Sequence, residues 1–324
     1  MAPIWKHALS HLSQVLALAH QAARPERPAL LVFMFHVLFE DAAAMSRHEV
    51  DPQQRITTGI FAQLVAHFLA HGYTFVTPAD VLRGLDPAGR YALLTFDDGY
   101  FNNQLALPIL RQYGVPATFF ISSHHVLAGQ AFWWDVVYRA RRQHPLPAAA
   151  QLAEYEHLKG MQHAEIDHYL LTHFGPDALR PVGDLDRPFT PTELQAFARE
   201  PEVTLGNHTA HHAILTNYAP AAAVRELDTC QQYLAQLTGP TPCAVAYPNG
   251  NTSVAVVAAA TTANLRLGVT VEPGKNYLPF AQHNVDILQL KRFLLWGNQD
   301  VERQCRLFRA DFNLKERLRS WRRG

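Results

Sequence analysis

The feature of this sequence that most constrains its fold is a series of short apolar runs of strand length. The first run is 29–35, and similar runs lie at 91–96, 117–121, 203–206, 243–247 and 267–271. A strand that is apolar throughout is typical of a sheet covered on both faces. Stretches with helical spacing, such as 59–71 and 221–237, separate the runs. This alternation predicts parallel βα units and an α/β fold.

One long segment interrupts the alternation. Residues 127–191 are mostly helical in pattern, and we interpret them as an insertion over one face of the sheet or barrel. We expect this insertion to belong to a single catalytic domain at 29–300. An amphipathic helix and linker at 1–28 would precede that domain, and a basic helix at 301–324 would follow it.

The two ends of the sequence bear on where the protein works. The apolar residues near the start are interrupted by polar ones, which is unlike a signal peptide or a membrane span, so we predict a cytoplasmic protein. The end of the sequence interleaves arginines with apolar side chains. Such a helix either rests on the anionic inner face of a membrane or packs on the barrel.

Charge and cysteine content exclude some classes of function. Lysine plus arginine and aspartate plus glutamate both number 28, so no overall field favours nucleic acid as a partner. Cys230, Cys243 and Cys305 are too few and too scattered for a disulfide framework or a CxxC zinc site. They favour a reducing compartment.

Two carboxylates end one of the predicted strands. The run 92–96 is followed directly by Asp97, Asp98 and Gly99. The carboxyl ends of parallel strands are where ligands bind in α/β folds, and two adjacent buried carboxylates repel each other unless a cation is present. The alternative interpretation is an ordinary surface turn.

A pair of histidines follows another predicted strand. His208 and His212 are four residues apart, which on a helical turn would let both imidazoles bind one ion, although His211 offers a second pairing. Histidine pairs of this kind are more often surface residues. Together with the two aspartates at another strand end, they predict a metal site.

These residues resemble the polysaccharide deacetylases, which are the family-four carbohydrate esterases. Residues 95–99 read Thr-Phe-Asp-Asp-Gly and residues 208–212 read His-Thr-Ala-His-His, with Leu215 at the customary distance. The resemblance covers about residues 30–295. It implies a distorted, TIM-like barrel of seven βα units with a helical insertion.

The resemblance also implies roles for the central residues. Asp98, His208 and His212 correspond to metal ligands, and Asp97 corresponds to the general base. Two histidines and one carboxylate suit zinc, although cobalt, nickel or manganese could bind as well. The cation would activate water and polarise the carbonyl of an acetyl group.

Other family elements match less closely. The third motif lacks its arginine and reads Tyr247-Pro248-Asn249-Gly250, where a backbone amide near Tyr247 or Asn249 would hold the oxyanion; the alternative is a plain turn. Arg292 resembles the late arginine that orients the catalytic aspartate, with a surface arginine as the alternative. The late histidine that acts as general acid has no clear counterpart.

Several further side chains are candidates for the active-site rim. His36, at the end of the first predicted strand, is the stronger candidate for the missing histidine, and His283 is the weaker one. Trp133 and Trp134 could stack on a sugar, with Asp135 accepting a hydroxyl hydrogen bond. Their alternative interpretation is a place in the core.

We therefore expect metal-dependent hydrolysis of an acetyl group, most simply an N-acetyl group, from a saccharide of surface polysaccharide or glycolipid biosynthesis. Two other functions stay open. One is an amidohydrolase acting on a non-sugar amide, and the other is a non-catalytic carbohydrate-binding relative. The sequence indicates neither the sugar nor the oligomeric state.

Overall fold

A computed structural model describes residues 15, 19 and 25–311 of the chain. Most of the predicted N-terminal helix at 1–28 lies outside the described residues. So do residues 312–324 of the predicted C-terminal helix.

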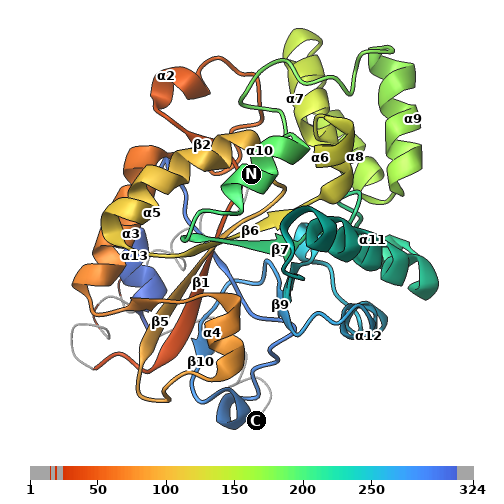
Figure 1. Ribbon diagram of the computed structural model, residues 1–324. Coiled ribbons are helices and arrows are strands. Elements are labelled where there is room, and N and C mark those ends of the chain that lie inside the picture. The colour runs from red at the N-terminus through yellow and green to blue at the C-terminus, as the bar shows by residue number, and fades with distance from the viewer. Residues whose placement is uncertain (1–14, 16–18, 20–24, 312–324) are drawn as a thin grey trace, which may run out of the picture.

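Parallel strands form the centre of the molecule (Figure 1). The main path of the sheet runs β10-β1-β5-β6-β7-β8-β9, with β11 paired to β1 and β4 paired to β5. All of these pairings are parallel except that of β10 with β1. The strands of the path are β1 (Ala29–Phe35), β5 (Arg90–Phe96), β6 (Ala117–Ile121), β7 (Val203–Asn207), β8 (Ala244–Ala246), β9 (Leu267–Val269) and β10 (Asn276–Tyr277). The short strands are β2 (Leu38–Phe39), β3 (Ile56–Thr57), β4 (Thr74–Phe75) and β11 (Phe293–Leu294), with β2 and β3 forming a separate pair.

The first strand shows why the predicted runs are apolar throughout. Leu31 and Phe33 point into one hydrophobic cluster, whereas Leu30 and Val32 point into another. Successive side chains of a strand point to opposite faces, so a strand between two cores needs apolar residues at every position. Each of the six predicted runs coincides with a strand to within two residues at either end.

The segment 290–294 draws the two ends of the sheet together. Leu290 forms a bridge with Val269 at the end of β9, and two residues later β11 pairs with β1. The parallel strands therefore curl into an incomplete barrel, as expected from the predicted distorted TIM-like fold. This connection also carries Arg292 into the interior, where its side chain is fully buried.

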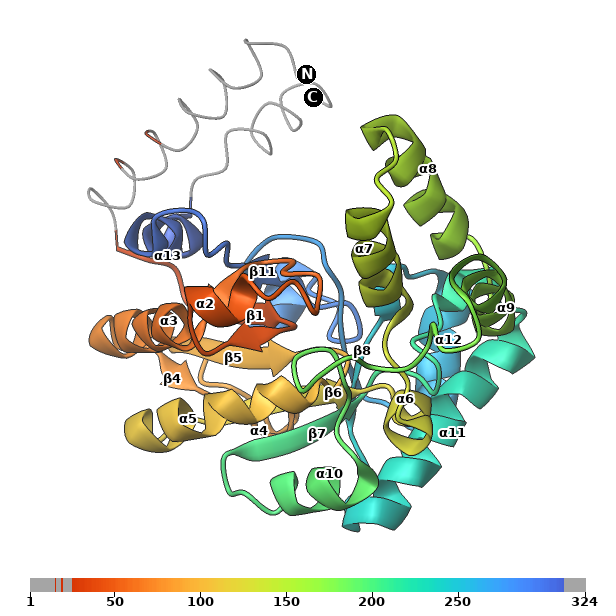
Figure 2. The ribbon, with the colours of Figure 1, turned by 90° about the horizontal axis from the view of Figure 1, so that it is seen from above.

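Helices cover the curled sheet (Figures 1 and 2). Those of the βα units are α3 (Thr58–Ala70), α4 (Pro78–Arg83), α5 (Leu107–Tyr113), α11 (Pro220–Thr238) and α12 (Val254–Thr262), with α2 (Ala42–Met45) in the loop after β2. The connection from β6 to β7 is longer and contains α6 (Ser123–Ala128), α7 (Trp133–Gln143), α8 (Ala148–Lys159), α9 (His163–Phe174) and α10 (Pro191–Phe197). Helices α7–α9 gather on one side of the molecule, away from α3 and α4, which confirms the predicted helical insertion (Figure 2).

The described part of the predicted C-terminal helix is α13 (Val301–Arg309). Cys305 is fully buried in the main core, and the ring of Phe308 lies 5.8 Å from that of Phe33 between centroids. This part of the helix packs on the barrel, which is the second of the two alternatives. Membrane contact by residues further along stays a prediction. Among the described residues, no helix combines the length and apolar character needed to cross a membrane.

Candidate active site

The turn after β5 brings two carboxylates to the carboxyl end of the sheet. The amide of Asp97 still donates to the carbonyl of Phe35 (2.9 Å), which continues the pairing with β1. The chain then turns sharply, with φ of 77° at Asp98 and 93° at Gly99. A Cβ atom at Gly99 would also lie 3.1 Å from Cδ1 of Ile121. Glycine therefore suits this position, because a Cβ atom would be strained at this φ and would lie tightly against Ile121.

The histidine pair lies on a loop, so the predicted helical turn is wrong. Residues 208–214 have no helical structure, and both Thr209 and His212 have positive φ, at 64° and 53°. Side chains replace the helical hydrogen bonds. Asn207 Oδ1 accepts from the amide of Thr209 (2.8 Å), and Thr209 Oγ1 accepts from the amide of Ala213 (2.7 Å). Local side-chain bonds of this kind compete with helix formation.

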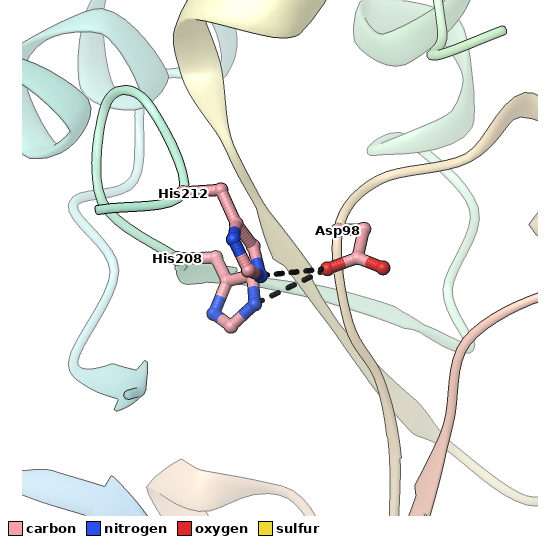
Figure 3. A group of neighbouring side chains, drawn as sticks. All are labelled: Asp98, His208 and His212. Carbon is pink, nitrogen blue, oxygen red and sulfur yellow. Dashed lines mark ion pairs between the residues drawn. The ribbon is translucent and has the colours of Figure 1, made fainter. Parts of the chain in front are cut away.

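The loop nevertheless makes the two imidazoles converge on Asp98 (Figure 3). Asp98 Oδ1 lies 3.3 Å from Nε2 of His208 and 3.4 Å from Nε2 of His212. Ligands of a tetrahedral zinc ion, at about 2.0–2.1 Å from the metal, lie about 3.3–3.4 Å from each other. The three side chains thus have the spacing of a metal-ligand set, and they form one of two such groups among the described residues.

Hydrogen bonding around the three residues favours a positive charge between them. His208 Nδ1 lies 2.7 Å from the carbonyl oxygen of Ala246, so this nitrogen carries the proton. In the neutral ring, Nε2 then presents a lone pair to a carboxylate oxygen, and two acceptors at 3.3 Å repel each other. Asp98 Oδ2 is also buried and has no hydrogen-bond partner. The residues therefore fit a divalent metal, with the Ala246 carbonyl fixing the tautomer of the ligand.

The electrostatics give the three residues different tendencies. Burial alone would lower the pKa of His208, but Asp98 beside it outweighs burial and raises that pKa. Burial alone would raise the pKa of Asp98, but the neighbouring imidazoles of His208 and His212 outweigh it and hold the pKa well below its usual value. The pKa of His212 is lowered, because burial disfavours the charged ring more than Asp98 stabilises it. Asp98 is therefore a carboxylate at neutral pH and His212 a neutral imidazole, which are the forms that bind metals.

The second aspartate has a different partner. Asp97 is nearly fully buried, and its two carboxylate oxygens each accept a 2.8 Å hydrogen bond from the guanidinium of Arg292. The same guanidinium also donates to Thr95 Oγ1 (3.1 Å) and to the carbonyl of Thr270 (2.7 Å). This bidentate contact fixes the orientation of the Asp97 carboxylate.

Arg292 also determines the charge of Asp97. Burial alone would raise the pKa of this carboxyl, but the adjacent guanidinium outweighs that effect and lowers the pKa below the usual value. Asp97 is therefore ionised throughout the neutral range. Arg292 itself is buried against the sheet, in contrast to the alternative interpretation of a surface arginine.

A cavity of about 320 Å³ opens beside the metal-ligand set. Asp98 and His212 line it, and so do three predicted rim residues, His36, Trp133 and Trp134, and the candidate oxyanion residue Asn249. The structure thus brings six of the site candidates, from four strand ends and from the insertion, to one cleft.

The orientation of His36 follows from its neighbour Gln54. Nε2 of Gln54 donates to the carbonyls of Met34 (2.8 Å) and Leu295 (3.1 Å), so Oε1 of the same amide is an acceptor. It lies 2.9 Å from Nδ1 of His36, which must carry the proton. The other ring nitrogen, Nε2, is then available to the cleft.

The two tryptophans have different environments. Trp134 is 8% exposed, donates from Nε1 to the hydroxyl of Tyr100 (2.8 Å), and its ring lies 4.6 Å from that of His212 between centroids. It therefore packs against His212 and belongs largely to the core. Trp133 is half-buried and packs on Tyr155 at the cleft, which leaves part of its ring accessible.

Three other candidates offer no free group to the cleft. The amide of Tyr247 donates to Val269 (3.2 Å) and its side chain lies in the core, so it offers no oxyanion donor. Asp135 is fully buried and accepts from the Tyr100 hydroxyl (2.7 Å) and the amide of Asp51 (2.8 Å). His283 packs on Tyr277, which pairs with the first residue of β1, at the opposite end of the sheet.

Sequence reasoning missed several residues of the cleft. Asp51, Tyr155 and Lys159 also line the cavity, and Gln54 orients His36. They come from the loop before β3 and from helix α8 of the insertion. No strand end or spacing pattern marks them in the sequence, because only the packing of these segments brings them to the site.

Comparison with known proteins identifies the family of the chain. Residues 85–268, more than half of the chain, match the model of the polysaccharide deacetylase family. No curated protein has a sequence that matches this chain.

Several solved structures with a similar fold are deacetylases. The deacetylase PplD of Streptococcus pyogenes, in complex with acetate, is 18% identical, with a TM-score of 0.58 over 87% of this chain and 99% of that one. IcaB from Ammonifex degensii is 16% identical, with a TM-score of 0.57 over 88% and 99%. BC0361, a polysaccharide deacetylase from Bacillus cereus, is 17% identical, with a TM-score of 0.59 over 87% and 69%. With this family match and this fold, the chain belongs to the polysaccharide deacetylases, which are hydrolases acting on acetylated carbohydrates.

Proposed function

We propose that the protein is a metal-dependent deacetylase that removes an N-acetyl group from a saccharide. The observation that supports this most directly is the pair of 3.3 and 3.4 Å separations between Asp98 Oδ1 and the two histidine Nε2 atoms. The neighbouring Asp97 lies outside this ligand set and is held by an arginine instead. Two adjacent carboxylates thus have two separate environments, which is typical of separate chemical roles.

A divalent cation held by Asp98, His208 and His212 would polarise the acetyl carbonyl and lower the pKa of water beside it. Zinc suits two imidazoles and one carboxylate, and cobalt, nickel and manganese are further candidates. Three protein ligands rather than four would suit a catalytic rather than a structural site, and two of them, Asp98 and His212, line the cleft.

Asp97 acts as the general base in this proposal. The oxygen of water attacks the carbonyl carbon of the acetamido group, and the proton of that water passes to Asp97. Arg292 keeps Asp97 ionised and oriented before the reaction. Because both oxygens of Asp97 already accept hydrogen bonds from Arg292, the proton must use a remaining lone pair.

His36 is our candidate for the general acid. When the C–N bond breaks, acetate leaves on one side and the sugar amine needs a proton on the other. His36 lines the cleft beside Asp98, and the Gln54 contact keeps one proton on Nδ1. The transferable proton is therefore a second one, which Nε2 carries when the ring is the imidazolium. Asn249 lines the same cleft and remains our candidate for an oxyanion contact.

The exposed part of Trp133 supports a saccharide as substrate, because aromatic rings pack on the apolar faces of pyranoses. We further propose a cytoplasmic protein acting on a precursor of surface polysaccharide or glycolipid. The three cysteines Cys230, Cys243 and Cys305 are unpaired, in line with a reducing compartment.

The test is acetate release from acetylated chitooligosaccharides and from lipid-linked amino-sugar precursors. The full-length protein is stripped of metal, assayed, and assayed again after zinc is restored. We expect release only with metal. Cleavage of small amides that lack a sugar would favour the amidohydrolase alternative. Saccharide binding with metal present and no acetate release would favour a non-catalytic carbohydrate-binding protein.

A further inference from the structure

A second cavity lies beside the active-site cleft. Its volume is about 480 Å³, and it shares two lining residues, Asp51 and Gln53, with the cleft that contains Asp98. The two cavities are therefore adjacent, so a substrate of more than one sugar unit can extend from one into the other. We call the second cavity the basic basin, because Arg55 and Arg142 also line it.

We propose that the basic basin binds an anionic group, a phosphate or a carboxylate, on the saccharide whose acetyl group lies in the cleft. This inference rests on the deacetylase function proposed above and narrows its substrate class to anionic saccharides. Guanidinium groups suit both kinds of anion, because their planar N–H donors contact two oxygens of a phosphate or carboxylate at once.

The two arginines of the basic basin differ from their neighbours in having no acidic partner. Arg47, Arg139 and Arg141 each form an ion pair with a carboxylate. No ion pair joins Arg55 or Arg142 to a carboxylate in the part of the chain that the structure describes. Both side chains are exposed, so a ligand can reach them. Two like charges that line one cavity repel each other, and a bound anion removes that repulsion.

Positive charge exceeds negative charge in the basic basin. Among the described residues that line it, Asp51 is the one carboxylate, and burial raises the pKa of this group. The ring of His48 lines the basin too, and its Nδ1 lies 2.9 Å from the hydroxyl of Tyr138. A histidine at this position can add a further N–H donor toward an anion.

The loop that carries Arg55 is held in a strained conformation. His48, Gln53 and Arg55 have positive φ values of 56°, 39° and 60°. Hydrogen bonds hold the loop in this shape, because the amide of Gln53 donates to Asp51 Oδ1 (3.0 Å) and that of Arg55 donates to the carbonyl of Pro52 (2.7 Å). Backbone strain of this kind clusters at ligand sites. The loop therefore fixes the backbone at Arg55 before a ligand arrives, which lowers the entropy cost of binding.

The test measures the binding of three saccharides by isothermal titration calorimetry. They are N,N′-diacetylchitobiose, its 1-phosphate, and a disaccharide of N-acetylglucosamine and glucuronic acid. The full-length protein carries Asp97→Asn, so that acetate release does not consume the ligand during the titration. We expect at least one of the anionic saccharides to bind about tenfold more tightly than the neutral one. This preference should shrink as the salt concentration is raised, because salt screens exposed charges.

Variants of the two arginines assign the preference to the basic basin. Arg55→Gln and Arg142→Gln should each reduce the ratio of the neutral to the anionic Kd by about threefold, and the double variant should bring it to about one. Arg47→Gln is the matched control, because Arg47 is an exposed arginine of the same β2–β3 connection that does not line the basin, and it should keep the ratio. Equal Kd values for all three saccharides, or a ratio that the double variant keeps, would overturn the proposal.

The three saccharides also separate the two sources of the anion and the two proposals. Tighter binding of the 1-phosphate alone would identify a phosphorylated precursor, and tighter binding of the uronic acid alone would identify an acidic polysaccharide. Acetate release from the same saccharides is measured with Asp97 intact. No release from any of them, with the binding preference retained, would refute the deacetylase and leave the anion subsite standing. Release from all of them, with equal Kd values, would refute the subsite and leave the deacetylase standing.

Discussion

Replacing Arg292 with methionine tests how the structure controls Asp97. The substitution keeps the length and apolar stem of the side chain but removes both hydrogen bonds to the carboxylate, each 2.8 Å long. Asp97 is 2% exposed, so no solvent replaces the guanidinium. Removing one partner of a buried ion pair costs about 3–5 kcal/mol, a large fraction of the stability of an ordinary domain. We expect Arg292→Met to lower the free energy of unfolding by that amount at pH 7.5.

The loss in free energy of unfolding should depend on pH in a defined direction. In the wild type, the pKa of Asp97 lies below its unfolded value, so its contribution is present above pH of about 4 and is lost as the pH falls through the folded pKa. In the variant, burial without the guanidinium raises the pKa of Asp97, so the folded state takes up a proton as the pH falls from neutrality. Below the raised pKa, the difference between the two proteins should therefore shrink by about 1.4 kcal/mol per pH unit.

The assay is urea denaturation at pH 7.5, 6.5 and 5.5, followed by circular dichroism. A chelator is present throughout, so that loss of metal at acid pH does not contribute. Arg292→Lys is the control, because it keeps a positive charge and should lose less stability. A difference below about 1 kcal/mol at pH 7.5, or one that stays constant with pH, would refute the reasoning.

Three further predictions concern the cleft. His36→Gln should lower kcat by about 10²–10⁴-fold with little change in KM, because it removes the proposed proton donor; unchanged kcat at all pH values would exclude His36 from the chemistry. Trp133→Ala should raise KM for a saccharide and leave kcat nearly unchanged, and an unchanged KM would assign Trp133 to the core alone. Gly99→Ala should destabilise the protein by about 1–3 kcal/mol in thermal unfolding, because φ at this residue is 93°, and a neutral effect would mean that the turn relaxes.

Much of the fold could be predicted because its strands are buried on both faces. The apolar run 29–35 coincides with β1, and the aspartates that follow 92–96 lie at the carboxyl end of β5, where the site is. The length of an apolar run and the spacing of its apolar residues are local properties of the sequence. They can therefore be recognised without knowing the tertiary contacts.

The details of the site depended on contacts that sequence spacing does not contain. His208 and His212 converge through a loop held by Asn207 and Thr209, although their spacing suggested a helix. Asp135 looked like a sugar-binding residue, but Tyr100 and the amide of Asp51 occupy its carboxylate. The hydrogen bonds of Asn207 and Thr209 shape the loop locally, and those of Asp135 join distant segments. Neither kind of bond follows from the spacing of apolar residues in the sequence.

The most direct test of the account compares Asp97→Asn with Asp98→Asn for both acetate release and bound zinc. If Asp97 is the base and Asp98 a ligand, Asp97→Asn should bind as much zinc as the wild type but release acetate about 10²–10⁴-fold more slowly. Asp98→Asn should bind one zinc ion fewer and also lose activity. Acetate release at the wild-type rate by Asp97→Asn, with its zinc in place, would contradict the central claim.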